Sequence, residues 1–386
     1  MRWWSSHRGG VYFSLAACLV LTVLMSTSCM LERALVTSEE ANSVRVYKKM
    51  ADTTVLISST YASAHHITQA SIKGLGSGVL IDDQGSIVTN AHVVDGAAKI
   101  TVTFHDGTRL PAKLIGSDPQ SDVALLHVAL PHGPHTVAQL GDSDKLEIGQ
   151  KVLAIGHPFG LGYAFSTGIV SGFGKLLEPR QEAFQERVIQ TTTPMNLGNS
   201  GGPLVDSEDR VIGINSAILM GAQNIGFAIP INTVKSIVAE LRRNGRVIRP
   251  WLGVKGKFVT DDVRNLIALP LVNGLLILDV EKGSPAEAIG VRAGNLDVTI
   301  EGESWILGGD ILVAVNGQDV KSNEQYTKVL GELKAKQPIE ITLSRDGVKY
   351  SMSVILGERP IPHNPVQLPK LEMLPLIPQI LPFAQF

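Results

Sequence analysis

The stretch that decides the fold is Asn196-Leu197-Gly198-Asn199-Ser200-Gly201-Gly202-Pro203-Leu204. A serine hydroxyl becomes a useful nucleophile only when a base takes its proton and fixed donors stabilise the oxyanion that forms. Glycines on both sides of Ser200 allow a tight turn, in which the amides of Gly198 and Ser200 can point into one small hole. We therefore predict an oxyanion hole from Gly198, Asn199 and Ser200. A glycine-rich turn between strands is the alternative for this stretch alone.

Two upstream segments carry the other groups that this chemistry needs. Residues 87–94 place His92 just after an apolar strand, and residues 121–126 place Asp122 at the start of another. The order His, Asp, Ser along the chain is that of the chymotrypsin fold, whereas subtilisins and α/β-hydrolases have the other two orders. His92, Asp122 and Ser200 are therefore a candidate catalytic triad.

Short apolar runs separated by Gly, Asp and Asn surround these motifs, which is typical of an antiparallel barrel or sandwich. Asp106-Gly107 predicts a type I′ hairpin turn between two of the runs. The expected strands cover residues 77–81, 87–90, 99–104, 110–115, 123–128, 151–155, 166–172, 188–192, 202–206, 211–217 and 224–230.

A helix is expected after the last of these strands. Asn232 is the predicted N-cap, and Gly245 is the predicted end of the helix. Four apolar residues between them have the i, i+3, i+4, i+7 spacing of one buried face: Val234, Ile237, Val238 and Leu241.

A second strand-rich unit, residues 251–357, follows a linker at 246–250. Ser284-Pro285 predicts the start of a short helix, and Ser322 with Gln325 predicts a capping box for a helix that extends to about residue 334. The segment 295–307 is longer than a usual turn, and the sequence assigns it no role. Residues 358–386 contain seven prolines and are expected to be a tail without a fold of its own.

Several segments in order resemble the HtrA (Deg) serine proteases: residues 76–79, 89–94, 122–126, 154–160 and 198–204. The resemblance covers about residues 45–357. It implies a mainly β chain, with a chymotrypsin-like double β-barrel over residues 51–245 followed by a PDZ domain over 251–357. It also implies that His92 acts as base and then acid, that Asp122 orients it, and that Ser200 forms an acyl-enzyme.

The resemblance also locates a substrate pocket. Trypsins carry an Asp six residues before the serine, and this chain has Pro194 there. Because this position carries no charge, the pocket is expected to favour small aliphatic residues such as Val or Ala. Its predicted residues are Pro194, Ile214, Asn215, Ser216 and Ala217.

The sequence also departs from the family pattern beside the nucleophile. Leu197 stands where the family usually has proline, so no ring fixes φ next to the oxyanion hole. Asn199 stands where secreted trypsins have an Asp that pairs with a new N-terminal amine, so no zymogen cleavage is expected. Control is expected from loops, among them residues 174–187, where Lys175 matches the family's basic sensor residue.

The segment Trp251-Leu252-Gly253-Val254 matches the carboxylate-binding loop of HtrA PDZ domains. In such a loop the amides hold the terminal carboxylate of a peptide, while its last residues pair with a sheet edge. Peptides with hydrophobic C-termini are therefore expected partners, as is the chain's own tail, which ends in Phe386. A hydrophobic strand start is the alternative for Trp251, and a disordered spacer is the alternative for the tail.

Composition narrows the function further. The chain of 386 residues has 34 Lys and Arg against 36 Asp and Glu, a formal charge of −2, so nucleic acid is not an expected partner. Glycine is frequent, at 38 residues, and aromatic residues make up only 5%, which favours a β-rich fold. Both cysteines, Cys18 and Cys29, precede residue 30, so no thiolate metal site or disulfide framework is expected later. No cofactor or metal is predicted.

The first 30 residues have the layout of a targeting segment. Arg2 and Arg8 precede an apolar stretch at 11–25, which as a helix spans only about 22 Å of a membrane core of about 30 Å. Export to the bacterial periplasm on a cleaved signal is therefore expected. A membrane anchor and a lipoprotein cleavage site before Cys18 or Cys29 are the alternatives. Residues 31–50 are expected to be a lead-in segment.

The predicted function is that of a serine endopeptidase of protein quality control, acting on unfolded or mislocalised exported proteins under the control of its PDZ domain. The family resemblance implies a homotrimer built through the protease domains. The rival function is a peptide-binding or chaperone module with little proteolysis.

Overall fold

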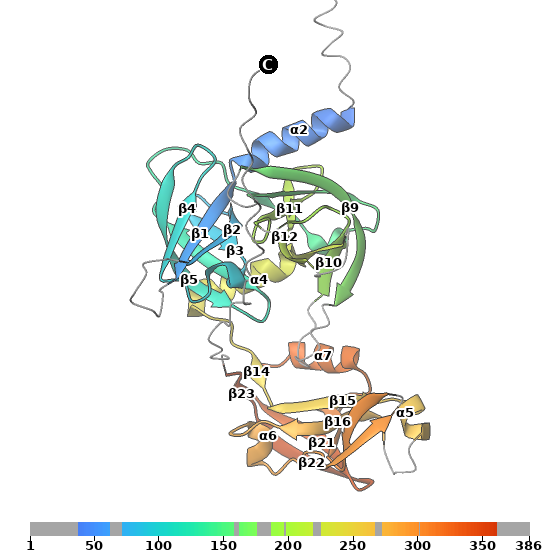
Figure 1. Ribbon diagram of the computed structural model, residues 1–386. Helices are drawn as coiled ribbons and strands as arrows, with labels where there is room; N and C mark the ends of the chain where they lie inside the picture. The colour runs from blue at the N-terminus through green and yellow to red at the C-terminus, as the bar shows by residue number, and fades with distance from the viewer. Residues whose placement is uncertain are drawn as a thin grey trace, which may run out of the picture.

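The computed structural model describes residues 38–61, 72–157, 162–175, 187–196, 198–218, 225–266, 272–300 and 302–360. The chain forms an N-terminal helix, two β-barrels side by side, and a smaller C-terminal unit beneath them (Figure 1). Within these ranges, no helix combines the length and apolar character that a membrane crossing requires.

The first barrel closes through six antiparallel strands in the order β1-β2-β3-β6-β5-β4, with β4 pairing back to β1. Alternate side chains point inward and form an apolar core that includes Ile57, Val102 and Leu126. The short helix α3 (Ala91–Val94) follows β3. The strands are β1 (Thr54–Tyr61), β2 (Ile72–Leu80), β3 (Ser86–Thr89), β4 (Lys99–Thr103), β5 (Arg109–Asp118) and β6 (Val123–Val128).

The second barrel closes in the order β11-β8-β9-β10-β13-β12, with β11 pairing to β12, and the two-residue strand β7 (Gln139–Leu140) adds to β12 in parallel. A single 3₁₀ turn, η1 (Ser143–Lys145), lies between β7 and β8 along the chain. The strands are β8 (Lys151–Gly156), β9 (Ala164–Lys175), β10 (Arg187–Thr191), β11 (Pro203–Val205), β12 (Arg210–Ile218) and β13 (Gly226–Pro230). The two barrels confirm the predicted chymotrypsin-like architecture.

A separate apolar layer joins the two barrels. It takes Val88 and Leu125 from the first barrel and Leu153 and Ile214 from the second, all buried. Helix α4 (Ile231–Asn244) packs on this layer through the four side chains predicted for its buried face, Val234, Ile237, Val238 and Leu241. Gly245 ends the helix as predicted, with a φ of 69° and its amide bonded to the carbonyl of Leu241.

Two local predictions are wrong. Helix α4 begins at Ile231 with Pro230 as the N-cap residue, and the Asn232 side chain instead donates to Asp142 Oδ1 at 2.7 Å. The hairpin between β4 and β5 is not type I′, because only Gly107 has a positive φ, of 86°. Its amide bonds to the carbonyl of Phe104, as in a type I turn followed by a glycine bulge.

The C-terminal unit is a sheet in the order β15-β16-β19-β21-β22, with β20 paired to β19 and a small ribbon of β14 and β23. Ser284 caps α6, and Ser322 caps α7 through the amide of Gln325, as predicted. Helix α7 ends at Gly331, three residues before the expected limit. The elements are β14 (Pro250–Trp251), β15 (Val254–Val259), α5 (Asp261–Leu266), β16 (Gly274–Val280), α6 (Pro285–Ala288), β19 (Ile311–Val315), β20 (Gln318–Asp319), α7 (Asn323–Gly331), β21 (Pro338–Arg345), β22 (Val348–Ile355) and β23 (Gly357–Glu358).

The long segment at 295–307 is a β-hairpin of β17 (Leu296–Ile300) and β18 (Glu303–Leu307). Its side chains Trp305 and Leu307 are buried against Leu276 and Val313 of the sheet, in a core separate from the one that α6 and α7 cover. The hairpin therefore gives the sheet a second apolar face, a role that the sequence did not predict.

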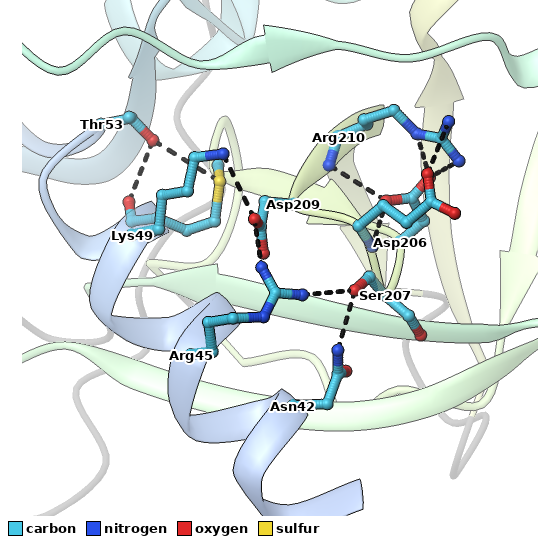
Figure 2. Close-up of polar contacts among 10 residues, drawn as sticks. Asn42, Arg45, Lys49, Thr53, Asp206, Ser207, Asp209 and Arg210 are labelled. Carbon is cyan, nitrogen blue, oxygen red and sulfur yellow. Dashed lines mark hydrogen bonds and ion pairs between the residues drawn. The ribbon is translucent and has the colours of Figure 1, made fainter. Parts of the chain in front are cut away.

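The segment predicted as a lead-in contains helix α2 (Ser38–Ala51), which packs on the barrels. Val46 and Met50 are fully buried in the layer between the barrels. Figure 2 shows the polar side of this contact, where Arg45 and Lys49 both bind the carboxylate of Asp209 in the turn between β11 and β12. The structure therefore differs from the expected boundary at residue 51, because α2 contributes to the protease core.

We expect Asp209→Asn to loosen helix α2. Asn tolerates the positive φ of 65° at this position, so the substitution removes the charge without straining the backbone. Because Arg45 and Lys49 are both half exposed, the loss should be about 1 kcal/mol, or about fivefold faster hydrogen exchange of the α2 amides. Glu208→Gln, which alters an exposed pair with Arg210, is the control and should leave this exchange unchanged. Equal hydrogen exchange of the α2 amides in both variants would contradict a role for Asp209 in holding α2.

Candidate active site

The imidazole of His92 and the carboxylate of Asp122 form the centre of the site. His92 lies on α3, and Asp122 lies in the turn that leads into β6. His92 Nδ1 is 2.9 Å from both carboxylate oxygens of Asp122, and the His92 amide donates to Oδ1 at 3.1 Å. With Nδ1–H donating to the carboxylate, the lone pair of Nε2 is available to accept a proton.

The backbone of Asp122 has a left-handed conformation, with a φ of 54°. The Asn90 side chain donates to the Asp122 carbonyl at 2.9 Å, and the Ser216 hydroxyl donates to Asp122 Oδ2 at 2.7 Å. These bonds come from the end of β3 and from β12 of the second barrel. They fix both the peptide and the carboxylate of Asp122.

Asp122 alters the basicity of His92. Partial burial of the ring lowers the pKa of His92, but the hydrogen bond and the negative charge of Asp122 together outweigh it and raise the pKa above the ordinary 6.5. The raised pKa means that His92 binds a proton more readily than a free imidazole does.

Ser200 lies between β10 and β11 and bonds to Ser216, the residue that contacts Asp122. Its hydroxyl donates to the carbonyl of Ser216 at 3.1 Å, so Ser216 bonds to Ser200 through its carbonyl and to Asp122 through its hydroxyl. For transfer of its proton, the Ser200 hydroxyl must turn from this carbonyl toward His92 Nε2. Such bonds are often unformed before substrate binds.

The loop around Ser200 has the conformation of a narrow turn. Gly198 has a φ of 103° and Gly201 a φ of 83°, both in the region that favours glycine. Asn199 is buried, and its amide and carbonyl bond to Asn196 and Gly202 within the turn. Among the residues that the structure describes, the amides of Gly198 and Ser200 have no acceptor, so both are available to an oxyanion.

The structure separates the five predicted pocket residues. Ile214 is buried in the layer between the barrels, and Asn215 is buried with its side chain bonded to the carbonyl of Pro203, so neither forms a pocket wall. Ser216 faces Asp122, and Pro194 is exposed on the loop before Ser200. Ala217 lies on β12, but its side chain is outside the described residues.

The predicted carboxylate loop leads into β15, the edge strand of the C-terminal sheet. Gly253 has a φ of 82° and lies so close to Ser284 that a Cβ would be 2.0 Å from the Ser284 Cβ. Leu252 is buried in the core and Trp251 belongs to β14. In the described part of the chain the amides of Leu252 and Gly253 have no acceptor. Val254 starts the edge strand, so amides and an unpaired edge lie together, as peptide binding requires.

Asn90 and Ser216 have contacts that the sequence did not predict. Asn90 lies in a quoted motif without an assigned role, and Ser216 was expected to line the pocket. Ser216 follows the buried Asn215, and no sequence motif marks its hydroxyl as a partner of Asp122. Only knowledge of the strand register could have predicted that this side chain points toward Asp122. Leu197, most of the loop at 174–187 and the tail beyond residue 360 lie outside the described residues.

Comparison with known proteins agrees with this arrangement. The family model of a trypsin-like peptidase domain matches residues 76–214, and that of a PDZ domain matches residues 250–356. Protease Do-like 1, a chloroplastic protein of Arabidopsis thaliana, is 35% identical over 84% of this chain and 73% of its own length. A probable periplasmic serine endoprotease DegP-like from Marinomonas sp. (strain MWYL1) is 38% identical over 76% of the chain, which spans only 59% of that relative.

Solved structures give the same result. The HtrA-type protease AlgW with decapeptide has a TM-score of 0.69 and 29% identity, over 83% of this chain and 99% of its own. A serine endoprotease from Yersinia pestis has a TM-score of 0.64 and 28% identity, over 82% of this chain and 98% of its own. With its two barrels, its PDZ domain and these relatives, the chain belongs to the HtrA/DegP family of serine endoproteases.

Proposed function

We propose that this chain is a serine endopeptidase that cleaves proteins through His92, Asp122 and Ser200. The observation that carries the proposal is the bonded series from Ser200 through Ser216 to Asp122 and His92. It assembles a nucleophile, a base and an orienting carboxylate from both barrels at one point. That arrangement suits acyl transfer.

The reaction proceeds in two halves. His92 Nε2 takes the Ser200 proton while Oγ bonds to the scissile carbonyl carbon, and the amides of Gly198 and Ser200 bind the oxyanion. His92 then gives that proton to the leaving amine as the C–N bond breaks, which leaves an acyl-enzyme. Water repeats the sequence and releases the second product. Asp122 holds the tautomer of His92 and stabilises its positive form.

The substrates we propose are unfolded or mislocalised exported proteins, cut after small aliphatic residues such as Val or Ala. Pro194 supports this preference, because it leaves the position of the trypsin aspartate without a charge. The relatives named as periplasmic support export, and the targeting layout of residues 1–30 supports the same location. A signal peptide, an anchor or a lipid at Cys18 or Cys29 would each deliver the chain there.

The PDZ domain is proposed to bind hydrophobic C-terminal peptides and to regulate proteolysis. The AlgW structure that this chain resembles contains a decapeptide, which supports peptide binding. A direct contact supports regulation: Arg249, two residues before Trp251, forms an ion pair with the buried Asp118 and donates to Ser121 Oγ at 2.6 Å. Ser121 precedes Asp122, so the peptide-binding loop and the triad share a short connection.

The proposed assembly is a homotrimer formed through the protease domains. Ile148 is 68% exposed and Ile169 is 42% exposed in the single chain, although both are apolar. Lys151, which pairs with Ile169 across β8 and β9, also bonds to Glu39 of α2. Exposed apolar groups of this kind are suited to burial against a second copy.

Replacement of Ser200 tests the proposed activity. Ser200→Ala should reduce digestion of unfolded casein by about 10⁴-fold or more, because no hydroxyl remains to form the acyl-enzyme. Ser236→Ala, which removes an exposed hydroxyl on α4, should digest casein at the wild-type rate. Equal digestion by wild type and Ser200→Ala would contradict the triad. Protection of casein from aggregation without digestion by wild type would favour the chaperone function.

Acid should inactivate the enzyme at a higher pH than an ordinary histidine predicts. His92 must be neutral to accept a proton, and Asp122 raises its pKa above 6.5. We therefore expect kcat/KM for a peptide substrate to fall as the pH drops through a midpoint above 6.5, while circular dichroism shows the fold intact. A midpoint below about pH 6 would contradict the raised pKa of His92.

Weakening of the contact between Arg249 and Asp118 should reduce the effect of peptide binding at the PDZ domain on proteolysis. Arg249→Lys keeps the charge but loses the planar fork that binds both oxygens of Asp118. The change in kcat/KM caused by a hydrophobic C-terminal decapeptide should fall at least about twofold. Arg246→Lys, whose partner Glu358 lies on β23, should retain the wild-type response. The same response in Arg249→Lys as in wild type would reject this route.

A further inference from the structure

Ser77 is a residue of the first barrel that bonds directly to the nucleophile loop. It lies on β2, on the opposite barrel from Ser200, and is fully buried. Its amide donates to the carbonyl of Ser200 at 2.8 Å, and its hydroxyl donates to the carbonyl of Gly198 at 2.6 Å. A single residue thus bonds to two points of the loop that carries the proposed oxyanion donors.

These two bonds fix the peptide planes on either side of the Ser200 amide. The Gly198 carbonyl belongs to the peptide that joins Gly198 to Asn199, and the Ser200 carbonyl belongs to the peptide that joins Ser200 to Gly201. The peptide between them carries the Ser200 N–H. Because Gly198 has a positive φ and lacks a Cβ, its own backbone resists rotation weakly. Ser77 supplies the restraint from outside.

The Ser77 side chain is itself held in place. Its oxygen accepts from the His157 amide at 2.9 Å, at the end of β8, while it donates to Gly198. Its carbonyl accepts from the buried Thr89 hydroxyl at 2.7 Å. The Ser77 hydroxyl therefore has one donor and one acceptor, which orients its proton toward Gly198. Leu197, where the family usually has proline, leaves the adjoining residue without a ring restraint.

We propose that Ser77 is a positioning residue for catalysis, which holds the Ser200 amide in the geometry that binds the oxyanion. This role rests on the proposed triad, because the oxyanion forms only when Ser200 attacks. Ser77 touches neither substrate nor the reacting atoms. Its loss should therefore weaken binding of the transition state and leave binding of the substrate unchanged.

The test is Ser77→Ala in the full chain, assayed with a quenched peptide that has Val before the scissile bond. We expect kcat to fall about 10- to 100-fold, less than the loss of an oxyanion donor outright, with KM within about twofold of wild type. The inhibition constant of a matching peptide boronic acid, whose tetrahedral oxygen uses the same donors, should rise by the same factor. A merely structural role would not move kcat and this constant together while sparing KM.

Ser143→Ala is the matched control. Ser143 is also buried, and its hydroxyl bonds to one backbone amide, that of Asn232, away from the nucleophile loop. It should keep the wild-type kcat and inhibition constant. A wild-type kcat in Ser77→Ala, or an equal loss in Ser143→Ala, would overturn the proposal. Where Ser77→Ala fails to fold, Ser77→Cys keeps the side chain's shape with a weaker donor, and an unchanged kcat there would overturn it equally.

Ser200→Ala, measured alongside, separates this inference from the proposed function. Full activity in Ser200→Ala would end the proposed triad and the role of Ser77 with it. An inactive Ser200→Ala beside a fully active Ser77→Ala would leave the triad in place and reject only the positioning role.

Discussion

The site depends on the apolar layer between the two barrels, because neither barrel carries all the groups that the chemistry needs. His92 and Asp122 come from the first barrel, and Ser200 and Ser216 from the second. The layer packs both barrels, α2 and α4 into one core. Side chains in such a core interdigitate at close to crystal density, so one barrel cannot slide against the other by even a fraction of an ångström without strain. The 2.7 Å hydrogen bond from Ser216 to Asp122 across the barrels can therefore persist.

The glycines of the nucleophile loop matter for this contact as well as for the turn. A Cβ on Gly201 would lie 2.1 Å from the Ser77 carbonyl oxygen, and one on Gly202 would lie 2.2 Å from the carbonyl oxygen of Ile155. A Cβ on Gly156 would likewise lie 2.5 Å from the side-chain oxygen of Asn199. The sequence suggested glycine for its positive φ, but the structure adds a second reason. At Gly201 the two barrels approach so closely that no side chain fits, and at Gly202 and Gly156 the nucleophile loop packs as tightly against β8 of its own barrel.

Local pattern predicted the fold well where the determinants are local. The apolar run at 123–128 is β6, and the spacing of the α4 side chains gave the buried face correctly. The sequence failed where distant residues decide. Helix α2 binds through Arg45 to Asp209, a partner 164 positions away. Ile214 was expected in the pocket but faces the core, because a shift of one residue in a strand reverses every side chain. The hairpin at 295–307 needed knowledge of the sheet face that it covers.

The turn before β6 is the point where the proposed triad and the PDZ domain meet. Asp adopts the left-handed conformation more readily than most residues, and the surroundings of Asp122 hold its φ of 54° in place. Asn90 holds the Asp122 carbonyl from within the first barrel. Arg249 holds the other end of the same turn through Asp118 and Ser121, and its own carbonyl accepts from the amide of Arg359, beside β23. A displacement of the β14–β23 ribbon would therefore act on the turn of the first barrel that carries Asp122, the residue proposed to orient His92.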